Sequence, residues 1–195
     1  MLYPPQGGSF RFDGGAVVVD FAHSGGEGRY AVFETLHRPR DLADWLAAPP
    51  LDLPRSLAVS DDDLAAARSA RTAFHTLLHA TAHGRPAPRP AITTVNRVAA
   101  VPPLAPRLGT TGGDGLVRRW APPVTVEAVL STLARELIDI LSGPLVERVH
   151  ECAGDNCGLI FVDTSRSGAR RWCSMPRCGN RQKVRAFRNR DREAR

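Results

Sequence analysis

Long apolar runs are missing from this 195-residue chain. No stretch approaches the roughly 18 consecutive apolar residues that a membrane-spanning helix needs. The first fifteen residues, MLYPPQGGSFRFDGG, also lack the basic region and apolar run of a secretory signal peptide. We therefore expect a cytoplasmic protein that has no membrane partner. With 43% hydrophobic residues, the chain can still bury a core, and its length suits one ordinary domain with a small appendage.

Sequence motifs of the common enzyme classes are absent as well. The glycine-rich stretch from Gly109 to Gly115 lacks the Gly-Lys-Ser/Thr ending of a phosphate-binding loop, so it predicts a turn before a short strand. We find no dinucleotide-binding fingerprint, no Ser-His-Asp order and no pair of carboxylates that would flank a cleft. The sequence therefore predicts that the protein is not an enzyme.

Basic residues are concentrated at one end of the chain. Residues 164–195 carry 11 basic and 2 acidic side chains, whereas residues 1–163 carry 15 basic and 18 acidic ones. Lys183 is the only lysine, so the clustering of the arginines is more informative than their identity. A positive segment of this kind indicates a polyanionic partner, most simply nucleic acid.

Cysteine occurs in one short segment only. Two C-x4-C pairs are separated by fifteen residues, and together they consist of Cys152, Cys157, Cys173 and Cys178. Thiolates in two closely spaced pairs are typical ligands of a tetrahedral zinc ion. Four such ligands leave no position for an activated water, so we predict one structural Zn²⁺. The alternative, two disulfides, needs an oxidising compartment to which nothing in the sequence directs the chain.

The last 47 residues, 149–195, are expected to form a small finger around this zinc ion. The pattern predicts a knuckle, then a β-hairpin with a strand over 159–162, a turn over 163–168 and a return over 170–172, and finally a basic helix from 179 to about 192. Such a helix can enter the major groove or follow the phosphates of DNA. The predicted nucleic-acid contacts are Arg181, Lys183, Arg185 and Arg188, assisted by Arg170 and Arg171. For Arg166, Arg170 and Arg171, a structural role is an equal alternative.

The first 148 residues are expected to form a mostly helical domain with a small β component. Helical periodicity covers residues 40–48, 60–83, 90–100 and 125–141. Ser60 and Asp63 have the spacing of a capping box at the start of the longest helix. Residues 9–22 indicate extended structure, in which the run Val17 to Val19 suits either a buried strand or an apolar helical turn.

A few polar residues of this domain are candidate ligands. Asp20, His23 and Trp45 could line a pocket for a small-molecule effector, although each suits a structural role better. His75, His79 and His83 recur every four residues on one helical face, which could hold a metal ion. No carboxylate at matching sequence positions completes such a site, so we expect this face to be solvated.

The string Cys178-Gly179-Asn180-Arg181, preceded by Arg170-Arg171-Trp172-Cys173, closely resembles the CGNR zinc finger family. Members of that family typically couple the finger to an N-terminal ABATE domain, described as a stress-induced transcription regulator. Residues 18–21, 41–46 and the helix that ends near Leu141 are similar to that domain, with 18–21 as a strand-like segment. The resemblance implies bacterial transcription regulation, zinc in the finger and DNA as the target.

The sequence as a whole predicts a DNA-binding transcription regulator, in which the helical domain senses an effector or forms a homodimer. A single small finger has a modest footprint, so specific DNA recognition would call for a dimer. The alternatives are a zinc module that binds RNA or protein, and a small-molecule-binding N-terminal domain.

Overall fold

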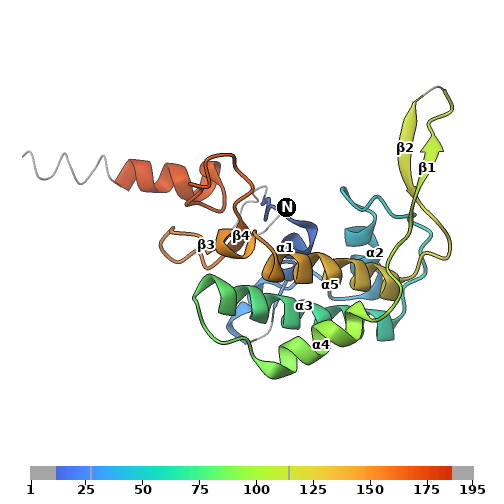
Figure 1. Ribbon diagram of the computed structural model, residues 1–195, viewed down its shortest axis with the longest axis horizontal. Helices are drawn as coiled ribbons and strands as arrows, with labels where there is room; N and C mark the ends of the chain where they lie inside the picture. Colours follow the sequence, from blue (N-terminus) through green and yellow to red (C-terminus); the bar gives the residue numbers. More distant parts are fainter. Residues whose placement is uncertain (1–11, 27, 114, 186–195) are drawn as a thin grey trace, which may run out of the picture.

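Helices make up about half of the described chain, which comprises residues 12–26, 28–113 and 115–185 of a computed structural model (Figure 1). Two short antiparallel strand pairs are the only sheets in these residues. This confirms the prediction of a mainly α fold with a small β component. The helices are α1 (Val17–Ala22), α2 (Pro39–Leu46), α3 (Asp61–Ala82), α4 (Arg89–Ala99) and α5 (Val126–Ser142), with 3-10 turns at Gly28–Phe33 and Val146–Arg148.

The longest helix, α3, begins at the predicted capping box. The hydroxyl of Ser60 accepts a 3.1 Å hydrogen bond from the backbone N–H of Asp63, whose carboxylate accepts a 2.8 Å bond from the N–H of Ser60. These two bonds satisfy backbone donors that the first turn of a helix leaves without partners. Thr125 caps α5 in the same way, through a 3.2 Å bond from the N–H of Ala128.

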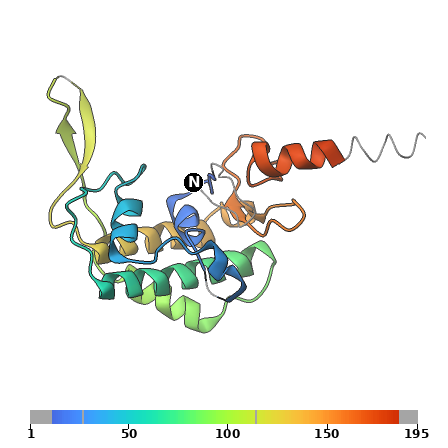
Figure 2. The same cartoon turned by 180° about the vertical axis from the view of Figure 1, so that it is seen from behind.

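The core lies where α1 packs against α3 and α5, while α4 covers the other side of the α3–α5 pair (Figures 1 and 2). The rings of Phe21 and Phe74 are both fully buried and pack edge to face, with their centroids 6.1 Å apart. The ring of Trp45, from α2, also packs edge to face on Phe21, with a centroid distance of 5.0 Å. Burial of a phenylalanine side chain contributes about 1.5–3 kcal/mol, so these rings are a main source of the domain's stability.

Residues 17–22 form a helix, so the general expectation of extended structure is wrong for this segment, and of the two alternatives for the run Val17 to Val19 the helical turn is confirmed. The reason lies far away in the sequence, in Glu136 of α5. Its carboxylate accepts hydrogen bonds of 3.3 and 2.7 Å from the backbone N–H groups of Val17 and Val18. A carboxylate at the N-terminus of a helix satisfies its free donors and favours its positive end, which outweighs the strand preference of valine.

The predicted turn before Leu116 connects β1 (Pro106–Thr110) and β2 (Leu116–Trp120), which form an antiparallel hairpin. This hairpin projects away from the helices (Figure 1). Leu108 lies opposite Arg118 in the register, and Thr110 lies opposite Leu116, so both leucines share one face. Their side chains are 76% and 72% exposed, so this face has no partner within the described part of the chain.

The cysteine-bearing segment begins with β3 (Val149–Glu151), which pairs with β4 (Ile160–Val162). The predicted strand is confirmed, but its partner precedes the first knuckle, and residues 170–172 are not a strand. The N–H of Val162 donates a 2.8 Å bond to the carbonyl of Gly14, just before α1. Ile160, Phe161 and Val162 are fully buried in the same core as the helices.

Among the described residues, no helix is both long and apolar enough to cross a membrane.

Candidate metal centre and nucleic-acid interface

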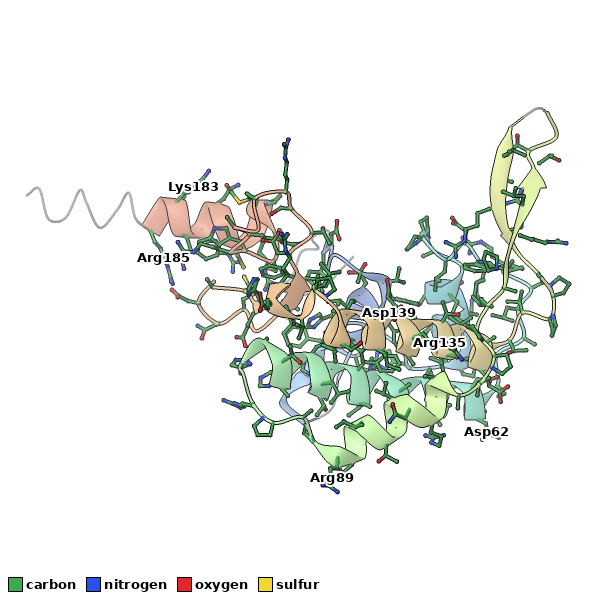
Figure 3. All side chains as sticks on the ribbon, in the orientation of Figure 1. Asp62, Arg89, Arg135, Asp139, Lys183 and Arg185 are labelled. Carbon is green, nitrogen blue, oxygen red and sulfur yellow. The ribbon has the colours of Figure 1, made fainter. Side chains whose placement is uncertain are left out.

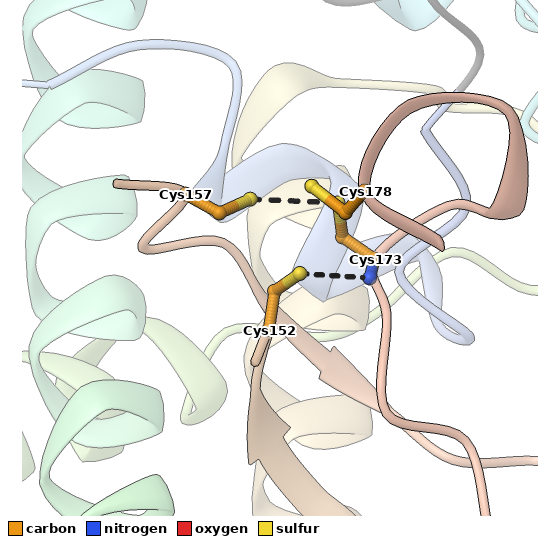
Figure 4. Close-up of side chains that lie close together, drawn as sticks. All are labelled: Cys152, Cys157, Cys173 and Cys178. Carbon is orange, nitrogen blue, oxygen red and sulfur yellow. Dashed lines mark hydrogen bonds between the residues drawn. The ribbon is translucent and has the colours of Figure 1, made fainter. Parts of the chain in front are cut away.

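The four cysteines gather at one point, although they come from separate parts of the finger (Figure 4). Cys152 follows β3, Cys157 ends the knuckle, Cys173 precedes the last helix, and Cys178 lies in its first turn, η3 (Met175–Gly179). Cys173 Sγ is 3.5 Å from Cys157 Sγ and 3.6 Å from Cys178 Sγ. A tetrahedral zinc ion with Zn–S bonds of about 2.3 Å holds its sulfurs about 3.8 Å apart. The cluster therefore fits one structural Zn²⁺, and all four thiols are free rather than joined in disulfides.

The electrostatics of the cluster call for a cation. Hydrogen bonding to Cys152 raises the pKa of the Cys157 thiol to about 12 and raises the pKa of Cys173 further. Hydrogen bonds from the same two thiols lower the pKa of Cys152 to about 2. Without a metal, the crowded sulfurs thus favour a thiolate at Cys152 and protonated thiols at Cys157 and Cys173. A divalent ion offsets the repulsion between thiolates and lets all four cysteines bind it deprotonated.

The knuckle leaves no room for a side chain at Gly154. A Cβ atom at this position would lie 2.9 Å from Cys178 Sγ and 3.4 Å from Cys152 Sγ. Asn156 then takes a left-handed conformation, with φ of 56°, which turns the chain so that Cys157 faces the other sulfurs. The backbone N–H of Cys173 completes the shell with a 3.2 Å bond to Cys152 Sγ.

Asp163 and Arg170 hold the loop between β4 and Cys173. The buried carboxylate of Asp163 accepts 2.8 Å bonds from the backbone N–H groups of Ser165 and Arg170. Burial alone would raise the pKa of Asp163, but these hydrogen bonds outweigh it and keep the pKa below its usual value. The guanidinium of Arg170 donates to the carbonyls of Asp13, Trp172 and Cys173 at 2.7–3.0 Å and lies over the ring of Phe161.

The basic helix is described as far as residue 185, and it is helical from Met175 onward. Arg181 and Lys183 are exposed. Lys183 and Arg185 point to opposite sides of the helix (Figure 3), and the guanidinium of Arg185 forms an ion pair with Asp155 in the knuckle. The predicted contact at Arg188 lies outside the described residues.

Beside this helix, the finger has a groove of about 660 Å³. Arg171 lines it and is exposed, with its guanidinium 5.3 Å from the ring of half-buried Trp172. Ser167, Ser174 and Met175 also contribute to the lining. A cation, an indole face and hydroxyl groups in one groove are suited to a phosphate and a stacked base.

The three candidate ligands of the helical part are held within the fold. Asp20 accepts a 2.8 Å bond from the N–H of Gly14, and burial raises its pKa to about 6. His23 is buried, and its Nε2 atom accepts a 3.0 Å bond from the N–H of Ile160. The ring of Trp45 packs on Phe21. The structure therefore gives each of these residues a partner that maintains the fold.

The histidine face of α3 does have a carboxylate beside it, contrary to the expectation from sequence. Glu151 of β3 reaches His83, with 2.8 Å between its Oε2 and the histidine Nε2. His79, His83 and Glu151 bring three possible ligand atoms within 4.8 Å of one another. The spacing along the chain could not show this, because the carboxylate comes from the finger and not from α3.

Two family models match successive parts of the chain. Residues 15–144 match the model of the ABATE family, described as "Putative stress-induced transcription regulator", and residues 148–191 match the CGNR zinc finger. The two matches confirm the predicted resemblance and its order along the chain. Neither of them is an enzyme family. No curated protein matches the chain.

Proposed function

Because the chain belongs to the ABATE family and ends in a CGNR zinc finger, we propose that it is a bacterial, cytoplasmic transcription regulator that binds DNA through the finger. The observation that carries this proposal is the position of Arg181 and Lys183. Both are exposed on a helix whose first turn contains the zinc ligand Cys178. A rigid metal centre fixes the direction of such a helix, and the width of an α-helix matches the major groove.

Other cations of the finger differ in how freely they can contact DNA. Arg171 is exposed beside the groove and is the natural second contact. Arg185 can exchange Asp155 for a phosphate, since both side chains of this ion pair are more than half exposed. The guanidinium of Arg170 already donates to three carbonyls, so we assign it to support of the loop rather than to DNA.

The helical part supplies the regulatory input in this proposal, and the β1–β2 hairpin gives it a means of pairing two copies. The exposed face that carries Leu108 and Leu116 would bury these side chains against a second chain, and two fingers would double the DNA footprint. Light scattering on the purified protein should show a dimer, and Leu108→Lys/Leu116→Lys should give a monomer. A monomeric parent protein would refute this pairing.

The groove beside Arg171 and Trp172 favours a second candidate, a protein that binds single-stranded RNA. An indole next to a cation can stack on an unpaired base, which a duplex does not offer. The affinities for duplex DNA and for single-stranded RNA separate the two candidates. A finger that enters the major groove binds duplex DNA more tightly than single strands, and an RNA-binding finger does the reverse.

Fluorescence anisotropy of the zinc-loaded full chain tests the proposal, with labelled duplex DNA and single-stranded RNA compared over a range of salt concentrations. We expect tighter binding to the duplex. Arg181→Ala/Lys183→Ala should weaken it at least about tenfold and make the slope of log affinity against log salt shallower by about 0.9 for each lost phosphate contact.

The control is Arg89→Ala/Arg97→Ala, which removes the same charge from exposed positions of α4, on the side of the molecule away from the basic helix (Figure 3). It should retain most of the affinity. Equal losses in the two variants would mean that only net charge matters, and unchanged binding in the finger variant would overturn the proposed interface. Selection of genomic DNA fragments with the same proteins then identifies the recognised sequence.

A further inference from the structure

We propose that His79, His83 and Glu151 form a second metal site, separate from the four cysteines, that binds a divalent transition-metal ion between α3 and the finger. His79 and His83 are one turn apart at the end of α3, and their rings are stacked with centroids 4.2 Å apart. Glu151 ends β3, which packs on α3. Two imidazoles and one carboxylate are a common ligand set for Zn²⁺ and its neighbours in the first transition row.

The distances suit such an ion. Nε2 of His83 and Oε2 of Glu151 are 2.8 Å apart, and no pair of the three ligand atoms exceeds 4.8 Å. At bond lengths near 2.1 Å, the ligands of a tetrahedral zinc ion lie about 3.4 Å apart. The three atoms therefore need only small side-chain adjustments to bind one ion.

The hydrogen bonds of His83 orient its ring for this role. Its Nδ1 atom is 2.8 Å from the carbonyl oxygen of His79. A carbonyl can only accept, so Nδ1 carries the proton, and in the neutral ring Nε2 presents a lone pair toward Glu151. A backbone carbonyl on one ring nitrogen is the usual way in which a metal-binding histidine is held.

With a neutral His83 ring, two acceptors would face each other across 2.8 Å, the Nε2 lone pair and the Glu151 carboxylate. Either a second ring proton or a metal ion satisfies this arrangement. A metal ion would bind all three ligands at once. The side chains of His83 and Glu151 are 30% and 35% exposed, so water can reach the site and fill the remaining coordination positions.

Occupation of this site would join the helical part to the finger. Glu151 directly precedes the zinc ligand Cys152, so an ion held by α3 and Glu151 restrains the strand that leads into the four-cysteine centre. The two sites differ in chemistry. The cysteine site is closed and holds its zinc through sulfur, while the histidine site is open and should exchange its ion with chelators.

The test uses the full chain loaded with one equivalent of Zn²⁺, which fills the cysteine site first because four thiolates bind zinc more tightly than two imidazoles and a carboxylate. Isothermal titration with further Zn²⁺ then measures binding at the second site. We expect one additional, weaker equivalent, and a rise in melting temperature that grows with free Zn²⁺. His79→Gln, His83→Gln and Glu151→Gln should each weaken this second binding step at least about tenfold without changing the tight first equivalent.

His37→Gln is the control, since His37 is exposed and lies before α2. It should bind the additional zinc as the parent protein does. Binding of no second equivalent would overturn the proposal, and His83 and Glu151 would then be a simple ion pair. Retention of the second equivalent in His83→Gln would also overturn it, because the ion would then sit elsewhere.

Discussion

The Nε2 atom of His23, at the end of α1, accepts a 3.0 Å hydrogen bond from the backbone N–H of Ile160 in β4. The bond joins the helical part to the finger across 137 positions of sequence, and it needs a neutral imidazole. Burial, together with the neighbouring His75, lowers the pKa of His23 to about 3. Burial likewise lowers the pKa of His75 to about 4.

These two histidines make the fold sensitive to acid. The unfolded chain binds protons on both near pH 6.5, whereas the folded chain does so only near pH 3–4, so stability falls as the pH drops below about 6.5. Asp20 acts in the opposite sense, because its folded pKa of about 6 lies above the unfolded value of 3.8. We expect a net loss of about 2 kcal/mol between pH 7 and pH 5.

Urea unfolding at a series of pH values, with bound zinc quantified at each, measures this loss. His75→Gln should show a shallower decline than the parent protein, because one of the two titrating groups is gone. His37→Gln, which removes an exposed histidine, should follow the parent curve. A parent protein equally stable at both pH values would contradict the expected coupling.

Substitution of Arg170 should affect stability more than DNA binding. Arg170→Ala removes hydrogen bonds to three carbonyls and exposes the ring of Phe161. With about 1 kcal/mol or more for each bond made by a charged donor, we expect a loss of about 3 kcal/mol in urea unfolding. Arg171→Ala should behave conversely, with weaker duplex binding and little change in stability. The assignment of Arg170 to the loop would be wrong if Arg170→Ala weakened duplex binding without a loss of stability.

In the proposed complex, Asp155 competes with DNA for Arg185, so its neutralisation should strengthen duplex binding. Asp155→Asn breaks an exposed ion pair, which costs less than about 1 kcal/mol of stability. It also removes a negative charge beside the basic helix, so we expect affinity at low salt to rise several-fold. The matched control is Asp62→Asn at the start of α3, far from the finger (Figure 3). An equal gain in both variants would show that only net charge acts.

Removal of zinc should destabilise the whole chain and not the finger alone. Ile160 and Phe161 are fully buried in the core that the helices share, and the strand that contains them is fixed by the cysteine site on one side. We expect chelation, or Cys173→Ser, to lower the melting temperature measured by far-UV circular dichroism, which is dominated by helices outside the finger. An unchanged helical transition after zinc loss would show that the finger folds independently.

Features that depend on neighbouring residues could be predicted from the sequence. The capping box of Ser60 and Asp63 fixes the start of α3 through contacts three residues apart. The four cysteines indicate zinc because thiolate chemistry and short spacing leave few alternatives. The turn after Thr110 follows from its glycines, and it indeed connects two strands. In each of these cases, the residues that determine the structure are close together in the chain.

Features that depend on distant partners could not be predicted in this way. The valines of α1 favour a strand by propensity, and only the carboxylate of Glu136, more than a hundred positions away, explains why they form a helix. Glu151 completes the histidine pair of α3 only once β3 has packed on that helix. Arg170 looks like a DNA contact by charge, and its three carbonyl acceptors become visible only in the fold.

The way in which β4 enters the core limits how this finger can be exchanged or reused. Many zinc modules can be transplanted between proteins, because their metal is most of what holds them together. Here, Val162 bonds to Gly14 and Ile160 bonds to His23, so the segment around α1 forms part of the finger's support. A chimera that grafts the finger onto another protein would leave three apolar side chains without cover. If the finger recognises DNA as proposed, new specificities are therefore better sought by varying exposed residues of the last helix than by swapping the module.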